Sequence, residues 1–288
     1  MDALKIEHLS KQYNTFLLDN VSFSIPKGYI MGFIGENGAG KTTTIKSMLN
    51  LVKRDSGKIT IFDKDIDQDE FSIKSNIGYV SGNLFYPKKK ISEITKVYKR
   101  FFKTWDEALY ASLLSKFSLV ESKRVDELSK GMQLKYLITL ALSHHAELLI
   151  LDEPTSGLDP VARDEVLEIF QSIVENEEAS IFFSTHITSD LEKCADYITF
   201  IKNGRIIESC SKDDMLDKYR IIQGTKNQLT DVKSRLIAYK ENAFGFLGLM
   251  KTSDLKEDDA IQHGQASLDD IMIYYAIKQP VIMSSDKE

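Results

Sequence analysis

The chain has 288 residues, of which 42% are hydrophobic and 28% charged, and its formal net charge is −6. A chain of this length and composition can bury a sizeable core, which excludes the disordered and fibrous classes of protein. The acidic balance argues against a general nucleic-acid binder, which usually carries a basic footprint, so no nucleic-acid partner is expected.

Two cysteines, Cys194 and Cys210, make no disulfide framework and fit a reducing compartment. The N-terminal residues lack a cationic stretch followed by an apolar one, which argues against a signal peptide. No run of 18 apolar residues occurs, so the chain is not expected to span a membrane by itself.

Three short apolar runs lie at residues 29–34, 148–151 and 180–184, and segments of helical period separate them. This alternation predicts a parallel α/β sheet. Polar residues follow each run directly: GENGAGKT, DEP and THI. Because ligands bind outside the carboxyl ends of parallel strands, we expect these three stretches to form one site.

The first of these stretches fits the phosphate-binding pattern GxxxxGK[ST] and precedes a helical segment. Its residues are Gly35, Glu36, Asn37, Gly38, Ala39, Gly40, Lys41 and Thr42, and Thr43 follows. The glycines let backbone N–H groups turn towards phosphate oxygens at a helix N-terminus. Lys41 is predicted to reach the β- and γ-phosphates, and the Thr42 hydroxyl to bind Mg²⁺.

Residues 83–128 are helical in pattern and rich in aromatic residues, which predicts a helical subdomain inserted into the sheet domain. Residues 88–103 carry seven lysines or arginines and one glutamate. A solvated helix face is the simpler interpretation. The alternative is that this face meets anionic headgroups or a membrane subunit.

The stretch LSKGM, at residues 128–132, precedes apolar residues at helical spacing, so Ser129 to Gly131 are expected at a helix N-terminus. A plain helix cap explains the serine. A serine hydroxyl and free amides at a positive helix end also form an anion site. Because the chain already has one phosphate-binding loop, a second one requires another nucleotide or another subunit.

The carboxylates Asp152 and Glu153 follow the second apolar run, and His186 follows the third. Beside a phosphate-binding loop, Asp152 is predicted to hold Mg²⁺, and Glu153 to polarise the attacking water as the catalytic base. His186 is predicted to contact the γ-phosphate. By contrast, His144 and His145 have no partner at a functional spacing and are interpreted as structural.

After about Ser211 no phosphate-type motif occurs. Ser267 and Asp270 have the spacing of a capping box, and a helical stripe follows that is predicted to face the core. Its members are Leu268, Ile271, Met272 and Tyr275.

In this order the stretches GENGAGKT, LSKGM, LLILDEP, SGLD and STH make the sequence resemble the nucleotide-binding subunit of an ABC transporter over residues 3–210. In that resemblance they look like the Walker A, signature, Walker B, D-loop and switch-histidine motifs. Asp159 then belongs to the D-loop, and Tyr13 matches the aromatic residue that stacks on adenine.

The resemblance implies the fold class: an α/β P-loop NTPase with a RecA-like parallel-sheet core, an antiparallel β subdomain, an inserted helical subdomain and a small C-terminal extension. The ATP-binding core would span 1–82 and 129–210, the helical subdomain with the membrane-subunit contact 83–128, and the extension 211–288. ATP and Mg²⁺ are the implied cofactors.

The implied partners are a second ATP-binding subunit, either identical or paralogous, and an integral membrane permease. In the dimer, Ser129, Lys130 and Gly131 would complete the γ-phosphate site of the other subunit. Membrane contact would be indirect, with the chain peripheral at the cytoplasmic face of the cell membrane.

The sequence departs from the family pattern at two places. The signature has Lys130 and Met132 where Gly and Gln are common, although Ser129 and Gly131 remain. At the Q-loop position, Gly82 and Asn83 stand where the family usually has a glutamine. Glycine has no ligand atom, so Asn83 is the candidate substitute.

Within the family, the chain resembles ATPases of bacterial peptide and antibiotic exporters of the bacitracin-resistance and YtrB-like type, and exporters of phenol-soluble modulins look similar. An ATPase that powers export through a separate transmembrane subunit is therefore expected. The alternative is a soluble ABC ATPase of translation or DNA maintenance. Those proteins usually carry two cassettes or a long coiled-coil insertion, and this chain has neither.

Overall fold

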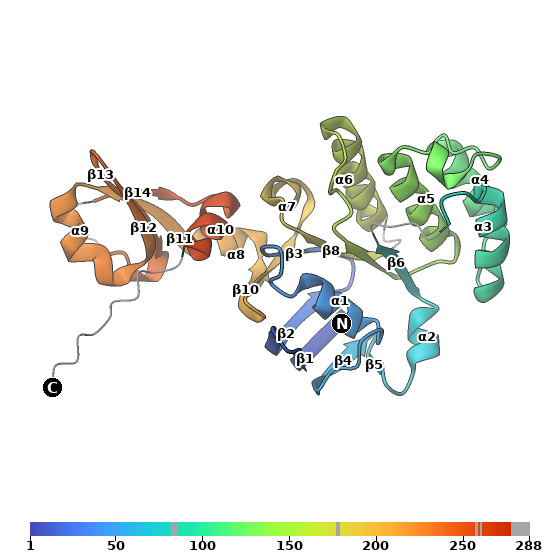
Figure 1. Cartoon of the computed structure of the whole chain (residues 1–288), viewed down its shortest axis with the longest axis horizontal. Helices are drawn as coiled ribbons and strands as arrows, with labels where there is room; N and C mark the ends of the chain where they lie inside the picture. The colour runs from blue at the N-terminus through green and yellow to red at the C-terminus, as the bar shows by residue number, and fades with distance from the viewer. Residues whose placement is uncertain (82–85, 177–178, 257–258, 260, 278–288) are drawn as a thin grey trace. The chain divides into compact units, whose positions relative to one another are not determined.

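The computed structural model describes residues 1–81, 86–176, 179–256, 259 and 261–277. The chain forms two compact units, Met1–Cys210 and Ser211–Glu288 (Figure 1).

An antiparallel sheet in the first unit has the strand order β2-β1-β4-β5. Its strands are β1 (Asp2–Gln12), β2 (Leu17–Pro26), β4 (Ser56–Ile61) and β5 (Lys64–Asp65). Along β2 the residues Leu18, Val21, Phe23 and Ile25 are buried, while the exposed or partly exposed positions lie between them. This near-alternation is expected of a sheet that has one face on the core and one in water.

A second sheet in the same unit has six strands in the order β10-β9-β3-β8-β7-β6. They are β3 (Ile30–Ile34), β6 (Ile77–Ser81), β7 (Leu148–Asp152), β8 (Ser180–Thr185), β9 (Tyr197–Lys202) and β10 (Arg205–Ser211). The three apolar runs of the sequence are the strands β3, β7 and β8, and β8 pairs in parallel with both of the others. The predicted parallel sheet is thus confirmed, with the three motif-bearing strands side by side.

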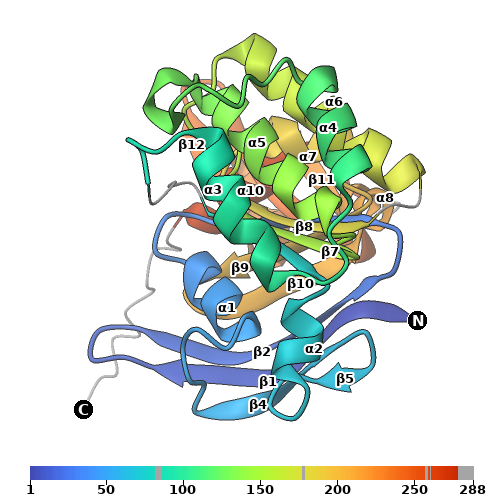
Figure 2. The same cartoon turned by 90° about the vertical axis from the view of Figure 1, so that its right-hand side faces the viewer.

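The parallel sheet is covered on both faces, which explains why every residue of β3 and β8 is buried. On one side α1 (Lys41–Met48) lies between this sheet and the antiparallel sheet, with Ile45 and Met48 in their shared core (Figure 2). On the other side α6 (Pro160–Glu175) and α7 (Thr188–Cys194) contact the strands. The short helix α2 (Glu70–Lys74) precedes β6.

The predicted helical segment contains α3 (Ile91–Tyr98) and α4 (Glu107–Lys116), and α4 packs on α5 (Lys130–Ser143). The hydroxyl of buried Thr95 lies 2.9 Å from the hydroxyls of both Tyr110 and Tyr136. His144 is buried and stacked on Phe102 at 3.8 Å between ring centroids, and burial lowers its pKa to about 4. A neutral, packed ring agrees with the structural interpretation of this histidine.

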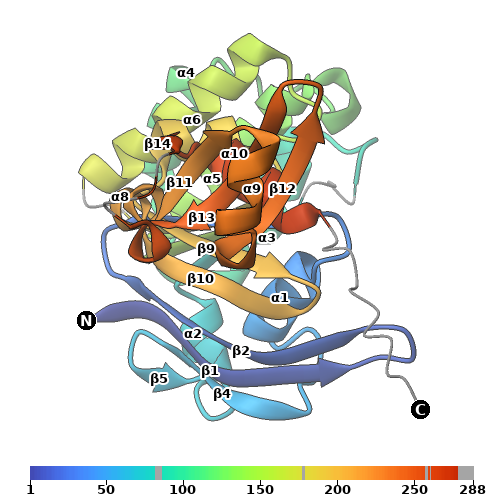
Figure 3. The same ribbon diagram turned by 90° about the vertical axis from the view of Figure 1, so that its left-hand side faces the viewer.

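The second unit is built on an antiparallel sheet with the strand order β12-β13-β11-β14. Its strands are β11 (Tyr219–Gly224), β12 (Leu236–Asn242), β13 (Gly245–Lys251) and β14 (Gln262–Gln265). Its helices are α8 (Lys212–Asp217), α9 (Lys226–Val232) and α10 (Leu268–Ala276). Figure 3 shows α9 lying against the strands, and Leu229 and Val232 of α9 belong to the core of this unit.

The helix α10 begins with the predicted capping box, because Ser267 accepts from the Asp270 N–H and Asp270 accepts from the Ser267 N–H. The predicted stripe is corrected in part. Leu268 and Ile271 are buried, but the third buried position is Tyr274, while Met272 and Tyr275 are only half-buried. The buried residues repeat every three positions, so fewer residues of α10 face the core than predicted.

Candidate functional site

The phosphate-binding loop connects β3 to α1, as the motif predicts. Gly38 and Gly40 have φ angles of +82° and +116°, a region that disfavours side chains. At Gly35 a Cβ atom would lie 2.4 Å from the carbonyl oxygen of Ile201, so the backbone passes too close to β9 for any side chain. These three glycines are therefore required by the course of the loop.

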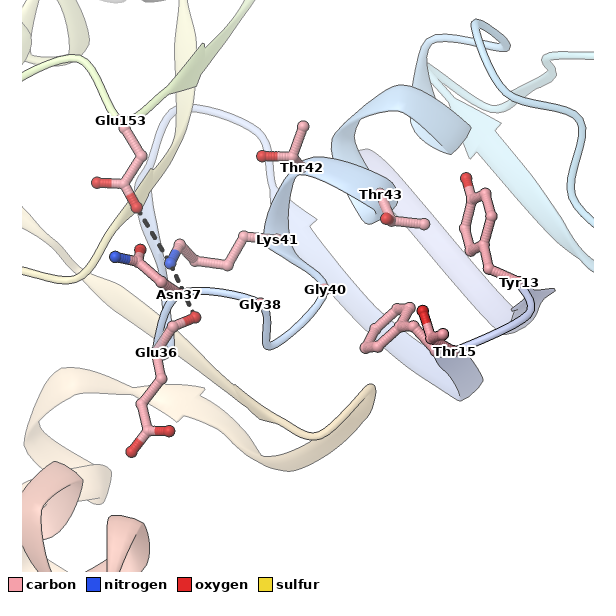
Figure 4. A pocket seen from close by; sticks show the side chains of 11 residues that line it. Tyr13, Thr15, Glu36, Asn37, Gly38, Gly40, Lys41, Thr42, Thr43 and Glu153 are labelled. Carbon is pink, nitrogen blue, oxygen red and sulfur yellow. Dashed lines mark hydrogen bonds and ion pairs between the residues drawn. The ribbon is translucent and has the colours of Figure 1, made fainter.

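Lys41 is buried at the first position of α1, and its side chain is 6% exposed. Its Nζ donates to the Gly35 carbonyl oxygen at 2.7 Å and to that of Glu36 at 3.3 Å. The same Nζ lies 3.0 Å from Glu153 Oε1 (Figure 4). The loop carbonyls thus hold the ammonium beside the carboxylate that follows β7.

Thr42 and Asp152 meet beside this lysine. Thr42 Oγ1 donates to Asp152 Oδ2 at 3.0 Å, and Ser184 Oγ donates to Asp152 Oδ1 at 2.6 Å. Ser184 is fully buried in β8. Sequence analysis did not single out this serine, although its place in the STH stretch, two residues before His186, is the signal that would have found it.

Glu153 occupies a strained backbone conformation, with a φ of +51° that non-glycine residues rarely adopt. Its N–H donates to Ser184 Oγ at 3.0 Å, and its Oε2 lies 2.8 Å from His186 Nδ1. The three strand ends therefore bring Glu153 into contact with both Lys41 and His186, as the parallel sheet leads us to expect.

A cavity of about 680 Å³ lies along the loop (Figure 4). It is lined by Tyr13, Thr15, Phe16, Glu36, Asn37, Gly38, Gly40, Lys41, Thr42, Thr43 and Glu153. Figure 4 shows Glu153 at one end and Tyr13 at the other, so the cavity offers both a polar and an aromatic end. Thr15 and Phe16 were missed by sequence analysis: they lie beside the predicted Tyr13 in the β1–β2 connection, and only the packing of that connection decides which of its side chains face the cavity.

The signature residues do not line this cavity. Ser129 is the N-cap of α5, as predicted, and its Oγ accepts from the Met132 N–H at 3.2 Å. Gly131 packs on α6, where a Cβ atom would lie 3.2 Å from that of Ala162. Lys130 extends towards the next motif, with its Nζ 2.7 Å from the position of a Cβ atom at Gly157.

Asp159, from the SGLD stretch, is the N-cap of α6, and its Oδ1 accepts from Val161 N–H at 3.1 Å and Ala162 N–H at 3.0 Å. The two Q-loop candidates, Gly82 and Asn83, lie outside the described residues.

Thr42 and Asp152 supply the hard oxygen ligands that Mg²⁺ prefers, and their side-chain oxygens already lie 3.0 Å apart. Among the described residues no group of three or more His, Cys, Asp and Glu side chains could hold a metal ion. Such a cage is not needed, because Mg²⁺ at phosphate sites is usually held by one or two side chains together with the substrate. The residues present therefore fit this ion.

Searching the described residues for a membrane-spanning helix, we find none of sufficient length and apolar character. Residues 18–156 match the model of the ABC transporter family.

Two curated relatives show how far the likeness extends. The bacitracin transport ATP-binding protein BcrA of Bacillus licheniformis is 31% identical over 83% of this chain and 79% of its own length. The lantibiotic transport ATP-binding protein SrtF of Streptococcus pyogenes is 35% identical over 71% of this chain and 89% of its own length.

A solved structure of the ATP-binding subunit of an ABC transporter superposes with a TM-score of 0.65. It is 30% identical and covers 74% of this chain and 91% of its own. The fold class that the sequence predicted is confirmed by this likeness. The chain therefore belongs to the family of ABC transporter ATP-binding proteins, and it is an ATPase.

Proposed function

We propose that this chain hydrolyses ATP with Mg²⁺ at the Lys41 site, as one of two ATP-binding subunits that drive a membrane exporter. The observation that carries the proposal is the contact series Lys41–Glu153–His186, in which Lys41 Nζ lies 3.0 Å and His186 Nδ1 2.8 Å from the carboxylate oxygens of Glu153. This series supports the proposal because a cation that can bind phosphate lies next to a carboxylate and an imidazole, which are groups that can orient and deprotonate an attacking water.

In this proposal Lys41 and the loop N–H groups bind the β- and γ-phosphates, and Tyr13 supports the adenine ring with its apolar face. Thr42 and Asp152 hold Mg²⁺, which when bound neutralises charge on the β- and γ-phosphates. Ser184 fixes the Asp152 carboxylate by its hydrogen bond at 2.6 Å.

Hydrolysis then depends on Glu153 and His186. The γ-phosphate competes with Glu153 for Lys41, which frees Oε1 to accept a proton from the attacking water. His186 holds the other oxygen, Oε2, at 2.8 Å and contacts the γ-phosphate. The strained backbone of Glu153 aims its side chain at this point, as strained residues at functional sites often do.

The second subunit would supply Ser129 and Gly131 to the same nucleotide. Ser129 stands at the positive end of the 14-residue helix α5, where the first backbone N–H groups have no acceptor within the helix, which supports an anion contact. Because that serine does not line the cavity of its own chain, the phosphate that it binds belongs to another copy or to a paralogue.

An integral permease is the second proposed partner, and a peptide or antibiotic the proposed cargo, because the relatives described above carry the words bacitracin transport and lantibiotic transport in their names. The chain would be peripheral, at the cytoplasmic face of the membrane. None of those names points to translation or DNA maintenance, so that alternative is not favoured.

The proposed contact for the permease is a groove of about 760 Å³ along α3. Tyr86, Val97 and Phe101 line it with side chains that are 65%, 55% and 71% exposed. Lys89, Lys96 and Arg100 line it as well. Apolar side chains beside cations suit an amphipathic segment that carries acidic residues.

Co-purification tests both partners. The full chain, expressed with the neighbouring open reading frames and extracted in detergent, is expected to bring down a polytopic membrane protein. Replacing exposed Lys89, Lys96 and Arg100, the three cations that line the groove, with Glu should reduce its recovery at least about tenfold, because reversed charges repel an acidic partner.

The matched control replaces three exposed lysines of the first unit that lie far from α3 in sequence, Lys53, Lys58 and Lys64, with Glu. This variant should recover the membrane protein as the parent does. Ribosomes in place of a membrane protein would refute the transport function. If the variant with glutamates in the groove along α3 recovered as much membrane protein as the parent does, the proposed contact would be refuted.

A further inference from the structure

Asp190 is a buried carboxylate near the site for which the mechanism above has no use. It lies in α7, four residues after His186, and no part of it is exposed to solvent. Burying a carboxylate is unfavourable unless it is paired, and burial raises the pKa of Asp190 above its ordinary value. The fold therefore retains this group against an electrostatic cost, and its contacts indicate why.

The two oxygens of Asp190 face opposite ends of one chain segment. Oδ2 accepts from Thr155 Oγ1 at 2.5 Å, and Thr155 is two residues after Glu153 and fully buried. Oδ1 lies 3.8 Å from Arg163 Nε, in the first turns of α6. The segment between these partners is the SGLD turn, which ends at the Asp159 cap of α6.

This arrangement has a direct consequence for the Glu153–His186 pair. Those side chains meet at 2.8 Å although they follow different strands, β7 and β8. On the Glu153 side, the chain is fixed through Thr155. On the His186 side, it is fixed because Asp190 belongs to the helix that begins two residues later. One buried carboxylate thus joins the two segments that carry the pair.

The backbone of Glu153 gives a second reason for such a link. A φ of +51° at a non-glycine residue costs energy and persists only where the surroundings hold it. Before the residue, β7 pairs with β8, and at the residue its N–H bonds to Ser184 Oγ at 3.0 Å. After the residue, the buried hydrogen bond between Thr155 and Asp190 holds the chain.

We infer that Asp190 is a positioning residue for ATP hydrolysis, because through Thr155 it holds Glu153 in register with His186. The inference rests on the proposed roles of Glu153 and His186. It assigns Asp190 no contact with ATP, so its loss should slow turnover and leave nucleotide binding in place.

The test compares Thr155→Val, which keeps the shape of the side chain and removes its hydroxyl, with Thr155→Ser, which keeps the hydroxyl. We would measure kcat, KM for ATP and the Kd of a fluorescent ATP analogue on the full chain, together with the thermal midpoint of the first unit, to which Thr155, Asp190 and the tryptophan Trp105 belong. Thr155→Val loses the hydrogen bond to the Asp190 carboxylate, and the free energy of such a bond to a charged group corresponds to a fall in kcat of about tenfold or more. Both KM and Kd should stay within about twofold, since no ATP contact changes. Thr155→Ser should keep the parental kcat.

Asp164→Asn is the matched control. Asp164 and Lys193 form an ion pair between the same two helices, α6 and α7, but Asp164 is solvent-exposed and Lys193 is only half-buried. Among the described residues, neither side chain takes part in the Thr155–Asp190 hydrogen bond. The kcat of this variant should equal that of the parent. A fall in this control equal to that of Thr155→Val would show that any link between the helices suffices, which would overturn the inference.

The double variant Thr155→Val with Asp190→Leu covers the case in which the single variant folds poorly. Removing Thr155 Oγ1 and the Asp190 carboxylate together leaves no unpaired buried carboxylate, and Arg163, the other partner of Asp190, has a side chain that is 31% exposed and can keep its charge in water. The thermal midpoint of the double variant should therefore recover. Its kcat should stay low, because the link is still absent. The role of Asp190 would be overturned if kcat recovered together with the thermal midpoint in the double variant. It would also be overturned if Thr155→Val kept the parental kcat, or if this variant lost kcat and ATP affinity to the same extent. If Lys41→Ala hydrolysed ATP at the parental rate, the proposed ATP site itself would be wrong, and that result is distinct from the results that concern Asp190.

Discussion

At the residue scale, the site depends on one side chain, Glu153, that has two partners. Its oxygens lie 3.0 Å from Lys41 Nζ and 2.8 Å from His186 Nδ1. The lysine contact is the one that a phosphate would replace, and the histidine contact orients the carboxylate towards the cavity. The negative charge of Glu153 and the orientation of its side chain therefore depend on different contacts, and a conservative substitution can remove the charge while the size of the side chain is kept.

Glu153→Gln keeps the size of the side chain and removes its negative charge and its capacity as a base. ATP hydrolysis should fall by about 10²- to 10⁴-fold, the usual contribution of a general base. ATP should bind at least as tightly as in the parent, because Lys41 no longer has a carboxylate beside it. Single-turnover kinetics and equilibrium binding of ATP measure the two effects, and ATP-dependent dimers should accumulate in size-exclusion chromatography.

The control for this variant is Glu147→Gln, at the residue before β7, where an exposed carboxylate pairs with Lys27 at 2.8 Å. It should hydrolyse ATP at the parental rate. If Glu153→Gln did so as well, Glu153 would not be the base.

At the element scale, the N-terminus of α5 has two roles: it packs against α6 in its own chain, and it is proposed to bind the γ-phosphate of a second subunit. Ser129 caps the helix, and Gly131 lets α5 approach α6 closely. Lys130, which departs from the family pattern, extends to Gly157 in the same chain. The helix end is thus held by its own chain, while the Ser129 side chain is left exposed.

Ser129→Arg should abolish ATP hydrolysis and leave ATP binding to the monomer unchanged, because the bulky cation blocks the approach of a second subunit and lies outside the cavity of its own chain. Loss of the cap should also lower stability by about 1 kcal/mol. Steady-state hydrolysis and binding of a fluorescent ATP analogue measure these effects.

Asp106→Ala is the control that removes a helix cap without touching the proposed phosphate contact, because Asp106 caps α4 by accepting from the Leu109 N–H at 2.9 Å. This control should lose similar stability and keep its hydrolysis. Loss of monomer binding in Ser129→Arg would mean that the signature has been assigned to the wrong subunit.

At the scale of the whole molecule, the chain has two units with separate cores, so a single two-state unfolding transition is not expected. The only tryptophan, Trp105, lies in the first unit. Its fluorescence therefore follows that unit alone, whereas circular dichroism follows both. The difference between the two signals isolates the second unit.

The second unit contains an ion pair whose titration gives it a pH dependence. Arg235 donates to both carboxylate oxygens of Asp259, at 2.6 Å each, and these bonds lower the pKa of Asp259 from its ordinary 3.8 to about 2. Because the folded pKa lies below the unfolded one, the stabilisation is complete above about pH 4 and is lost as the pH falls towards 2.

Asp259→Asn should accordingly lower the thermal midpoint of the second unit at pH 7 by roughly 4–8 °C, equivalent to about 1 kcal/mol in a domain of this size. The gap between variant and parent should close between pH 4 and pH 2, as the parent loses its ion pair. Asp231→Asn, at an exposed carboxylate in α9, is the control and should follow the parent. A gap that persists at pH 2 would contradict the ion-pair explanation.

How much the sequence predicted depends on the range of the interactions involved. Lys41, Thr42 and the loop glycines are specified by a contiguous motif, and Asp152, Glu153 and His186 by their places after apolar strands. Such features are local, so the order of residues suffices to predict them. The stripe on α10 was predicted less well, with Tyr275 in place of Tyr274, because the packing partner selects which residues of a helix face are buried.

The sequence by itself determined the family, the phosphate-binding loop, the parallel sheet and the convergence of three strand ends. Those properties follow from local patterns and from the fixed geometry of parallel strands. Only the tertiary structure decided that Ser184 bonds to Asp152, that Phe16 lines the cavity and that Asp190 reaches Thr155. Each of these contacts joins residues that are far apart in the chain, so no local pattern specifies them, and the packing of β1, β8 and α7 brings them together.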